Sequence, residues 1–200
     1  MKPALCRLFY MLQKIEYLNM LVEWNTNVQD RKFVASYSGG KDSSLALYKA
    51  IQIGEPVALI VMLEEQGLKS RSHGMSLDII HAQAKAIGLP IYTASATWQD
   101  YENQFIQLLR KAQALGAESL VTGDIDLMAH AEWNQSVCDK SELSLCMPLW
   151  QRPRLDIVHE FIQLGFQSII VTINLNLGMK VEDLGQVLSL EYIDELIARG

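Results

Sequence analysis

The chain has 200 residues, half of them hydrophobic, which is enough to bury one core of ordinary globular size. Its 17 Lys and Arg residues against 23 Asp and Glu residues give a net charge of −6 without any long basic run, so nucleic acid is a disfavoured partner. The three cysteines (Cys6, Cys138 and Cys146) form no Cys-x-x-Cys pair and therefore indicate reduced thiols in a cytoplasmic protein, not a metal or disulfide framework.

The first 31 residues are predicted to form a helical extension. Apolar residues recur at three- and four-residue steps: Leu5, Leu8, Leu12, Ile15 and Leu18. Charges at Arg7, Lys14 and Glu16 interrupt the apolar runs, so neither a membrane span of about 20 residues nor a signal peptide is expected. Residues 1–31 are compatible with covering an exposed surface or with self-association into a homo-oligomer.

From residue 32 onward, short β-rich runs alternate with helical patterns. The predicted strands are 33–37, 56–63, 90–94, 118–122, 145–148 and 168–173, and the predicted helices are 43–53, 76–87, 101–115, 129–138 and 155–164, with a last helix ending near Ile197. The run at 56–63 (PVALIVML) is almost unbroken in apolar residues, as in strands buried on both faces. The alternation predicts a three-layer α/β sandwich with a mainly parallel sheet, formed by residues 32–200.

The turn after the first predicted strand has the composition of a phosphate-binding loop, Ser38-Gly39-Gly40-Lys41-Asp42-Ser43. Gly39 and Gly40 lack Cβ atoms, so their backbone can approach an anion, and the N–H groups of the following helix start would point at phosphate oxygens. The two serines add hydroxyl donors and Lys41 adds positive charge. Asp42 can either cap the helix or help hold a magnesium ion. The spacing matches neither Walker A nor Gly-x-Gly-x-x-Gly.

Further candidate residues follow the next strands. His73 and Arg71 belong to a polar loop expected to overhang the same sheet edge, where Arg71 would add charge as pyrophosphate develops; an ordinary solvated loop is the alternative. Asp124 and Asp126 flank Ile125 after a strand, so both side chains are expected on one side, to bind magnesium or position ammonia. Alternatively, Asp124 only caps the next helix.

The segment Tyr37–Tyr48 closely resembles the opening of the diphthine–ammonia ligase family of PP-loop ATPases. The resemblance extends through Ser70–Gly74, Val121–Asp126 with His130 and Trp133, and Pro148–Trp150, and is strongest to the bacterial branch. It implies a HUP-type fold (adenine nucleotide alpha hydrolase-like) that uses ATP and Mg²⁺. It also implies that a carboxylate is activated as an acyl-adenylate, with release of pyrophosphate, and is then amidated by ammonia.

The resemblance also assigns residues. Ser38 to Ser43 would hold the pyrophosphate, the strand end at Met62 would lie by the adenine, and Gly123 with Asp124 would close the nucleotide site. His130 and Trp133 could line a substrate pocket, although a Trp at helical spacing is more often core. The residues expected to act on the reacting groups are Lys41, His73, Asp124 and Asp126.

The family usually continues past its last helix into a Gly-Glu-rich loop, whereas this sequence ends at Gly200. Two other functions are therefore kept open. One is a module that binds an adenine nucleotide without chemistry. The other is a PP-loop enzyme that modifies tRNA, against which the acidic charge and the absence of Cys pairs count.

Overall fold

The computed structural model describes Trp24 and residues 27–199 of the chain. The helix predicted over the first residues therefore lies outside the described residues. Trp24 itself is buried against Trp150, with ring centroids 5.7 Å apart in an edge-on arrangement. The Asn27 side chain donates to the Leu145 carbonyl at 2.9 Å, so the described end of the predicted extension packs onto the main fold.

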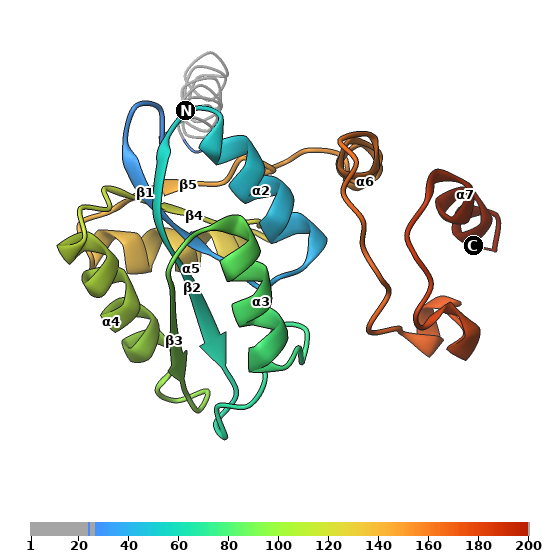
Figure 1. The fold of residues 1–200 in the computed structure, drawn as a ribbon, viewed down its shortest axis with the longest axis horizontal. Coiled ribbons are helices and arrows are strands. Elements are labelled where there is room, and N and C mark those ends of the chain that lie inside the picture. Colours follow the sequence, from blue (N-terminus) through green and yellow to red (C-terminus); the bar gives the residue numbers. More distant parts are fainter. Residues whose placement is uncertain (1–23, 25–26, 200) are drawn as a thin grey trace, which may run out of the picture.

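The centre of the fold is a parallel sheet of five strands (Figure 1). The strands are β1 (Lys32–Ser36), β2 (Glu55–Leu63), β3 (Ile91–Ser95), β4 (Ser119–Val121) and β5 (Ser144–Cys146). Their order in the sheet is β3-β2-β1-β4-β5. The chain thus builds outward from β1 to β3, then returns to add β4 and β5 on the other side of β1. The order reverses at β1, and the connections on its two sides diverge there.

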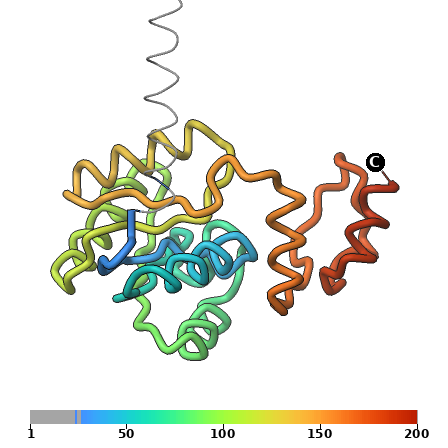
Figure 2. Tube along the Cα trace, turned by 90° about the horizontal axis from the view of Figure 1, so that it is seen from above, coloured from blue at the N-terminus to red at the C-terminus, as the bar shows by residue number. Residues whose placement is uncertain are grey.

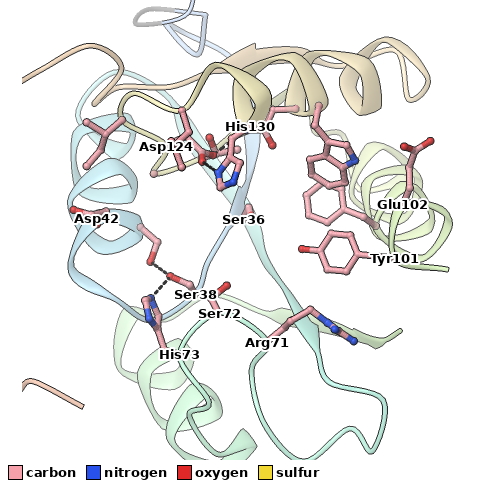
Figure 3. Close-up of a pocket in the computed structure, with 18 of the residues that line it drawn as sticks. Ser36, Ser38, Asp42, Arg71, Ser72, His73, Tyr101, Glu102, Asp124 and His130 are labelled. Atoms are coloured by element: carbon pink, nitrogen blue, oxygen red, sulfur yellow. Dashed lines mark hydrogen bonds and ion pairs between the residues drawn. The ribbon is translucent and has the colours of Figure 1, made fainter. Parts of the chain in front are cut away.

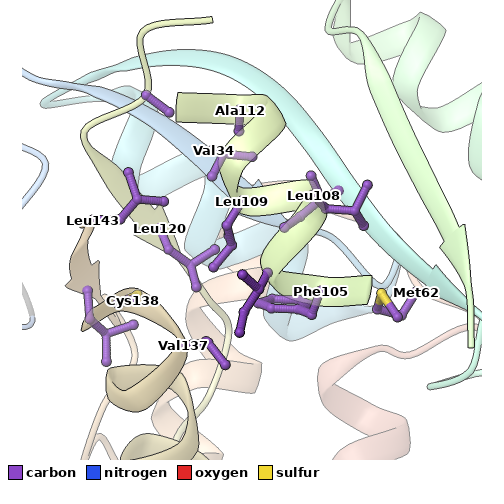
Figure 4. Close-up of a cluster of buried hydrophobic side chains, with 14 of the residues drawn as sticks. Val34, Met62, Phe105, Leu108, Leu109, Ala112, Leu120, Val137, Cys138 and Leu143 are labelled. Atoms are coloured by element: carbon purple, nitrogen blue, oxygen red, sulfur yellow. The ribbon is translucent and has the colours of Figure 1, made fainter. Parts of the chain in front are cut away.

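Helices cover both faces of the sheet: α2 (Lys41–Ile51), α3 (Leu77–Ile87), α4 (Tyr101–Ala114) and α5 (Met128–Asp139), with α6 (Arg154–Gln163) packed beside α2. The rest of the described chain forms short 3₁₀ turns at Leu175–Leu177 and Val181–Asp183 and the helix α7 (Leu190–Arg199). Side chains alternate along β2 as expected of a strand buried on both faces. Ala58, Ile60 and Met62 join the cluster beneath α4 and α5 (Figure 4), whereas the intervening residues join the cluster beneath α2 and α3. The predicted three-layer α/β sandwich is confirmed.

The strand predicted at 168–173 is wrong. In the described part of the chain this segment does not join the sheet: its backbone bonds locally, with Ile170 N–H donating to the Gln186 carbonyl at 3.0 Å and one antiparallel bridge linking Ile169 to Val187. Ile169 and Val171 are each 56% exposed. The apolar run favours extended backbone, but it cannot specify which partner that backbone pairs with. Figures 1 and 2 show that this segment and α7 lie beside the sandwich.

The other predicted strands and helices from residue 33 to residue 164 are confirmed, with bounds shifted by at most two residues. Such shifts at element ends are normal because the last turn of a helix and the last pair of a strand carry the weakest signals. Within the described residues, no helix is both long and apolar enough to cross a bilayer. Cys138 and Cys146 are buried as free thiols, and burial raises the pKa of each to about 12.

Candidate functional site

A cavity of about 1010 Å³ opens at the carboxyl ends of β1 and β4 (Figure 3). In parallel α/β sheets ligands bind at this edge, where the order of connections reverses. One side of the cavity is formed by the loop before α2 and by the loop after β2, and the other by the starts of α4 and α5. The residues that line it and bear on its chemistry are Ser38, Asp42, Ser43, Arg71, His73, Trp98, Tyr101, Phe105, Thr122, Gly123, Asp124, Asp126, His130, Trp133, Asn134 and Arg154.

The phosphate loop leaves the N-terminus of α2 open. Gly39 has a φ of 77°, the left-handed conformation that favours glycine, and Gly40 is the N-cap residue in extended conformation. No side chain of the described residues caps α2. The alternative that Asp42 caps α2 is wrong, because Gly40 is the N-cap residue and Asp42 lies within the first turn. The Asp42 carboxylate instead accepts from the Lys41 ammonium at 2.7 Å. The first N–H groups of α2 have no partner within the helix and are available to an anion.

Hydroxyl groups close the base of this loop. The Ser38 and Ser43 oxygens lie 3.0 Å apart, and both Ser43 and Ser44 donate to the Gly40 carbonyl, at 3.0 and 2.9 Å. These bonds fix the loop against the first turn of α2 before any ligand is bound. Ser38, Asp42 and Ser43 line the cavity, whereas the predicted loop residues Gly39, Gly40 and Lys41 are not among its lining residues.

His73 extends from the loop after β2 over the phosphate loop, and its Nε2 atom lies 3.2 Å from the Ser38 oxygen. The ring is partly exposed, but the atoms packed around it lower its pKa by desolvation, a larger effect than the raising by Asp42. Lys41 lowers the pKa further. A neutral imidazole is therefore the main form at neutral pH, and it can exchange a hydrogen bond with the Ser38 hydroxyl.

The lowered pKa of His73 should make the folded chain less stable as the pH falls. Below the unfolded pKa of 6.5 the unfolded chain binds more protons at His73 than the folded chain does, so the free energy of unfolding should fall as pH drops from 6.5 toward the folded pKa. We expect His73→Gln to flatten that fall in urea unfolding measured between pH 7.5 and 5.5. His81→Gln, on the exposed side of α3, is the control and should leave it unchanged. If the free energy of unfolding depends on pH equally in wild type and in His73→Gln, His73 does not have a lowered pKa in the folded chain.

Gly123 lies where the end of β4 meets the start of α2. A Cβ atom at this position would stand 2.7 Å from the Ser43 nitrogen and 2.8 Å from the Asp42 carbonyl carbon. These neighbours are backbone atoms, so only glycine allows so close an approach. The adjoining Thr122 hydroxyl is buried and lines the cavity, and no partner for it occurs among the described residues. A buried donor of this kind is normally satisfied by water or by a ligand.

The two predicted aspartates have different partners. Asp124 accepts from His130 Nδ1 at 2.9 Å and from Asn134 Nδ2 at 2.8 Å, both on α5. Because the N-cap residue of α5 is Leu127, the alternative that Asp124 caps this helix is wrong. Asp126 accepts two bonds from the Arg154 guanidinium, at 2.8 and 2.7 Å, and the bond to Arg154 is the main cause of its lowered pKa. Both aspartates line the cavity.

The far side of the cavity is an aromatic wall made of Trp98, Tyr101, Phe105 and Trp133. The Arg71 guanidinium lies 4.3 Å from the centroid of the Trp98 ring, within cation–π range. Its Nε atom is buried and has no hydrogen-bond partner in the described part of the chain. Burial raises the pKa of Tyr101; Arg71 lowers this pKa to a smaller extent, and Asp124 raises it slightly further.

Sequence reasoning missed most of this aromatic wall as well as Asn134 and Arg154. Trp98 and Tyr101 directly follow β3, so the rule that strand ends of a parallel sheet share one edge could have identified them. Asn134 and Arg154 carried no signal, because their contacts depend on how α5 and α6 pack. Met62, predicted to lie by adenine, has its side chain in the core, while its carbonyl accepts from the Arg71 backbone N–H at 3.0 Å. That adenine contact stays a prediction.

Asp42 is the predicted magnesium ligand. Across the described ranges, no three His, Cys, Asp or Glu side chains gather into a metal-binding cluster. Magnesium commonly binds through one or two carboxylates together with substrate phosphates and water. The carboxylate of Asp42, which belongs to the phosphate loop and lines the cavity, fits this mode. The ion would then bind together with the nucleotide and not in a preformed site.

Comparisons with known proteins identify a family for this region. A protein-family model described as the diphthamide synthase N-terminal domain matches residues 31–145. No curated protein gives a match. A solved structure of a predicted subunit of tRNA methyltransferase from Methanocaldococcus jannaschii is similar at 17% identity, with 70% of this chain and 79% of that chain covered and a TM-score of 0.47.

A second solved structure, the U34-tRNA thiolase NcsA from Methanococcus maripaludis with its [4Fe-4S] cluster, is similar at 14% identity. It covers 76% of this chain and 64% of that chain, with a TM-score of 0.45. At these values neither structural similarity bears on what this chain does.

Proposed function

This chain belongs to the diphthamide synthase N-terminal domain family, and on that basis we propose that it is an ATP-dependent, AMP-forming ligase. Its reaction would join the carboxylate of a small molecule or a protein to AMP, release pyrophosphate, and convert the acyl-adenylate to an amide with ammonia. The observation that carries the proposal is the uncapped N-terminus of α2, seated against Gly123 and opening into a cavity that continues to a second wall.

The residues present fit the phosphates of ATP. Gly39 adopts the left-handed conformation in the turn before α2, and Ser38, Asp42 and Ser43 on either side of the helix start line the cavity. Gly123 leaves no side chain between β4 and that helix start. Oriented backbone N–H groups with a helix dipole form an anion site without needing a cationic side chain. The partnerless Thr122 hydroxyl offers one further donor at the same edge.

Charged residues around the loop have separate roles in this proposal. Lys41 is held by Asp42 at 2.7 Å and would supply positive charge to the phosphates of the bound nucleotide. Neutral His73, bound to the Ser38 oxygen, would donate to a phosphate oxygen as negative charge grows on the leaving pyrophosphate. Magnesium, when bound with the nucleotide, would supply charge neutralisation at the phosphate oxygens.

The carboxylate substrate would bind toward the aromatic wall. Arg71 has a buried Nε–H without a partner in the described residues, beside the rings of Trp98 and Tyr101. A carboxylate oxygen is the natural acceptor for such a donor, because charge-assisted bonds to Arg are among the stronger ones in proteins. Asp126, already held by Arg154, would shape the opening between the two walls.

The test is the identity of the products. The protein is incubated with MgATP, ammonium and a panel of carboxylates, and the products are identified by ³¹P NMR. We expect AMP and pyrophosphate. ADP and phosphate as the only products would overturn the proposal. Tight ATP binding with no product for any carboxylate would favour the non-catalytic binding module. Turnover that requires tRNA would favour a tRNA-modifying enzyme instead.

The contribution of Asp42 can be isolated with a matched variant. Asp42→Asn should weaken MgATP binding by roughly tenfold or more, about 1.4 kcal/mol, because it removes the carboxylate beside the phosphates. Asp78→Asn is the control: Asp78 occupies the same second position of α3, so both variants lose an equivalent helix-dipole interaction. Isothermal titration calorimetry with and without Mg²⁺ measures the difference. Equal affinities in the two variants would remove Asp42 from the nucleotide site.

A further inference from the structure

We propose that His130, oriented by Asp124, is the general base that takes the proton from ammonia as the amide forms. This inference rests on the proposed function and assigns the second half of that reaction to a specific atom, His130 Nε2. It also gives Asp124 a definite role, as a positioning residue and not a magnesium ligand.

The geometry fixes the imidazole. One oxygen of Asp124 lies 2.9 Å from His130 Nδ1, and the other accepts from Asn134 Nδ2 at 2.8 Å. His130 and Asn134 are four residues apart on α5, so they lie on one face of the helix and hold the carboxylate between them. Both Asp124 oxygens are thus engaged by α5 side chains.

This arrangement selects one tautomer. An ionised carboxylate can only accept, so Nδ1 of His130 must carry the hydrogen, and in the neutral ring the lone pair is left on Nε2. The His130 side chain is 60% exposed and lines the cavity (Figure 3). The other imidazole of the lining, His73, already has its Nε2 at the Ser38 oxygen on the phosphate side. His130 therefore presents a proton acceptor on the opposite side of the cavity.

Amide formation requires ammonia to lose one proton. The ammonia nitrogen forms a bond to the acyl carbon, and the bond from that carbon to the phosphate oxygen breaks, with AMP leaving with the electron pair. The attacking nitrogen must lose one proton to become a neutral amide, and Nε2 takes it. The imidazolium is stabilised by the Asp124 carboxylate and returns the proton to solvent through its exposed edge.

The first test reads the tautomer. Long-range ¹H–¹⁵N NMR of the His130 ring in the full chain at pH 8 should show the Nδ1–H form predominating, and Asp124→Ala should shift the ring toward the Nε2–H form that free imidazole side chains prefer. A wild-type ring that is already Nε2–H would overturn the inference, whether or not a substrate is known.

The second test separates the two half-reactions. ATP–pyrophosphate exchange is measured with acetate, aspartate, glutamate and a peptide carboxylate as probes, and amide formation is measured with ammonium or with hydroxylamine. We expect His130→Gln to keep exchange within about threefold and to slow ammonia-dependent amide formation by roughly 10²–10⁴-fold. Hydroxylamine, which is a stronger nucleophile and is unprotonated at neutral pH, should reduce that defect. His81→Gln should match wild type in every assay.

The outcomes distinguish the two proposals. Wild type that exchanges with none of the probes overturns the proposed ligase function, and this inference with it. Exchange in wild type together with undiminished amide formation in His130→Gln overturns only the role of His130. Equal loss of exchange and amide formation in His130→Gln also overturns that role, because a base for the second step should not affect the first.

Discussion

Gly39→Val is expected to reduce ATP affinity at least about a hundredfold, equivalent to about 2.8 kcal/mol, while the chain still folds. A valine would have to adopt a φ of 77°, and its Cβ would approach Met75 Cε at 2.4 Å and Gln83 Oε1 at 2.5 Å. Both contacts are with the ends of flexible side chains, so the protein can relax around them. The loop itself cannot keep the left-handed turn at Gly39, on which the proposed phosphate contacts of the α2 N–H groups depend.

The control separates backbone strain from loss of the site. Gly88 ends α3 with a φ of 82°, and no atom of the described residues lies within 4 Å of its would-be Cβ. Gly88→Val should therefore suffer similar strain, roughly 1–3 kcal/mol, and retain wild-type affinity. Calorimetric titration with MgATP and urea unfolding measure the two quantities. Wild-type ATP affinity in folded Gly39→Val would remove the phosphate-loop assignment.

Gly123→Ala should have the second large effect, on stability and ATP binding together. The added methyl group meets the backbone of Ser43 at 2.7 Å and of Asp42 at 2.8 Å, and neither can move without displacing the start of α2. We expect a loss of several kcal/mol in the free energy of unfolding, in the upper range for single substitutions, and no measurable ATP binding in the folded fraction.

Gly40→Ala offers the contrast that tests this explanation. A Cβ at Gly40 would lie 2.4 Å from His73 Nε2, which is a side-chain atom. Adding His73→Ala should therefore restore much of the stability lost in Gly40→Ala, whereas it should restore none of the stability lost in Gly123→Ala. Circular dichroism melts of the two single and two double variants give the comparison. Rescue of Gly123→Ala by His73→Ala would show that the backbone contact does not limit this position.

The local signals in the sequence were sufficient for most of the architecture. The unbroken apolar run at 56–63 predicted a strand buried on both faces, and β2 is that strand, because such a run can satisfy its side chains only between two layers of helices. The loop from Ser38 to Ser43 could likewise be placed at a strand–helix junction, since glycine there reports a backbone requirement and not a packing preference.

The backbone partners of an extended segment and the hydrogen-bond partners of the site aspartates could be identified only from the tertiary structure. The apolar pattern at 168–173 is compatible with extended backbone, but its backbone partners among the described residues are 185–188, because pairing depends on what the rest of the chain brings alongside. Asp124 was identified as a site residue from its position after β4. Its attachment to His130 and Asn134, and that of Asp126 to Arg154, depend on the packing of α5 and α6.

The sequence by itself therefore determined the order of strands and helices between residues 33 and 164 and the position of the glycine turn at residues 38–43 between β1 and α2, because local periodicity and glycine positions encode these features. Only the tertiary structure decided that Gly123 approaches the backbone of α2, that an aromatic wall faces the loop across the cavity, and which aspartate orients an imidazole. The first two features arise from contacts between residues far apart in the chain, and the third depends on how the segment before α5 folds against that helix, so no local pattern encodes them.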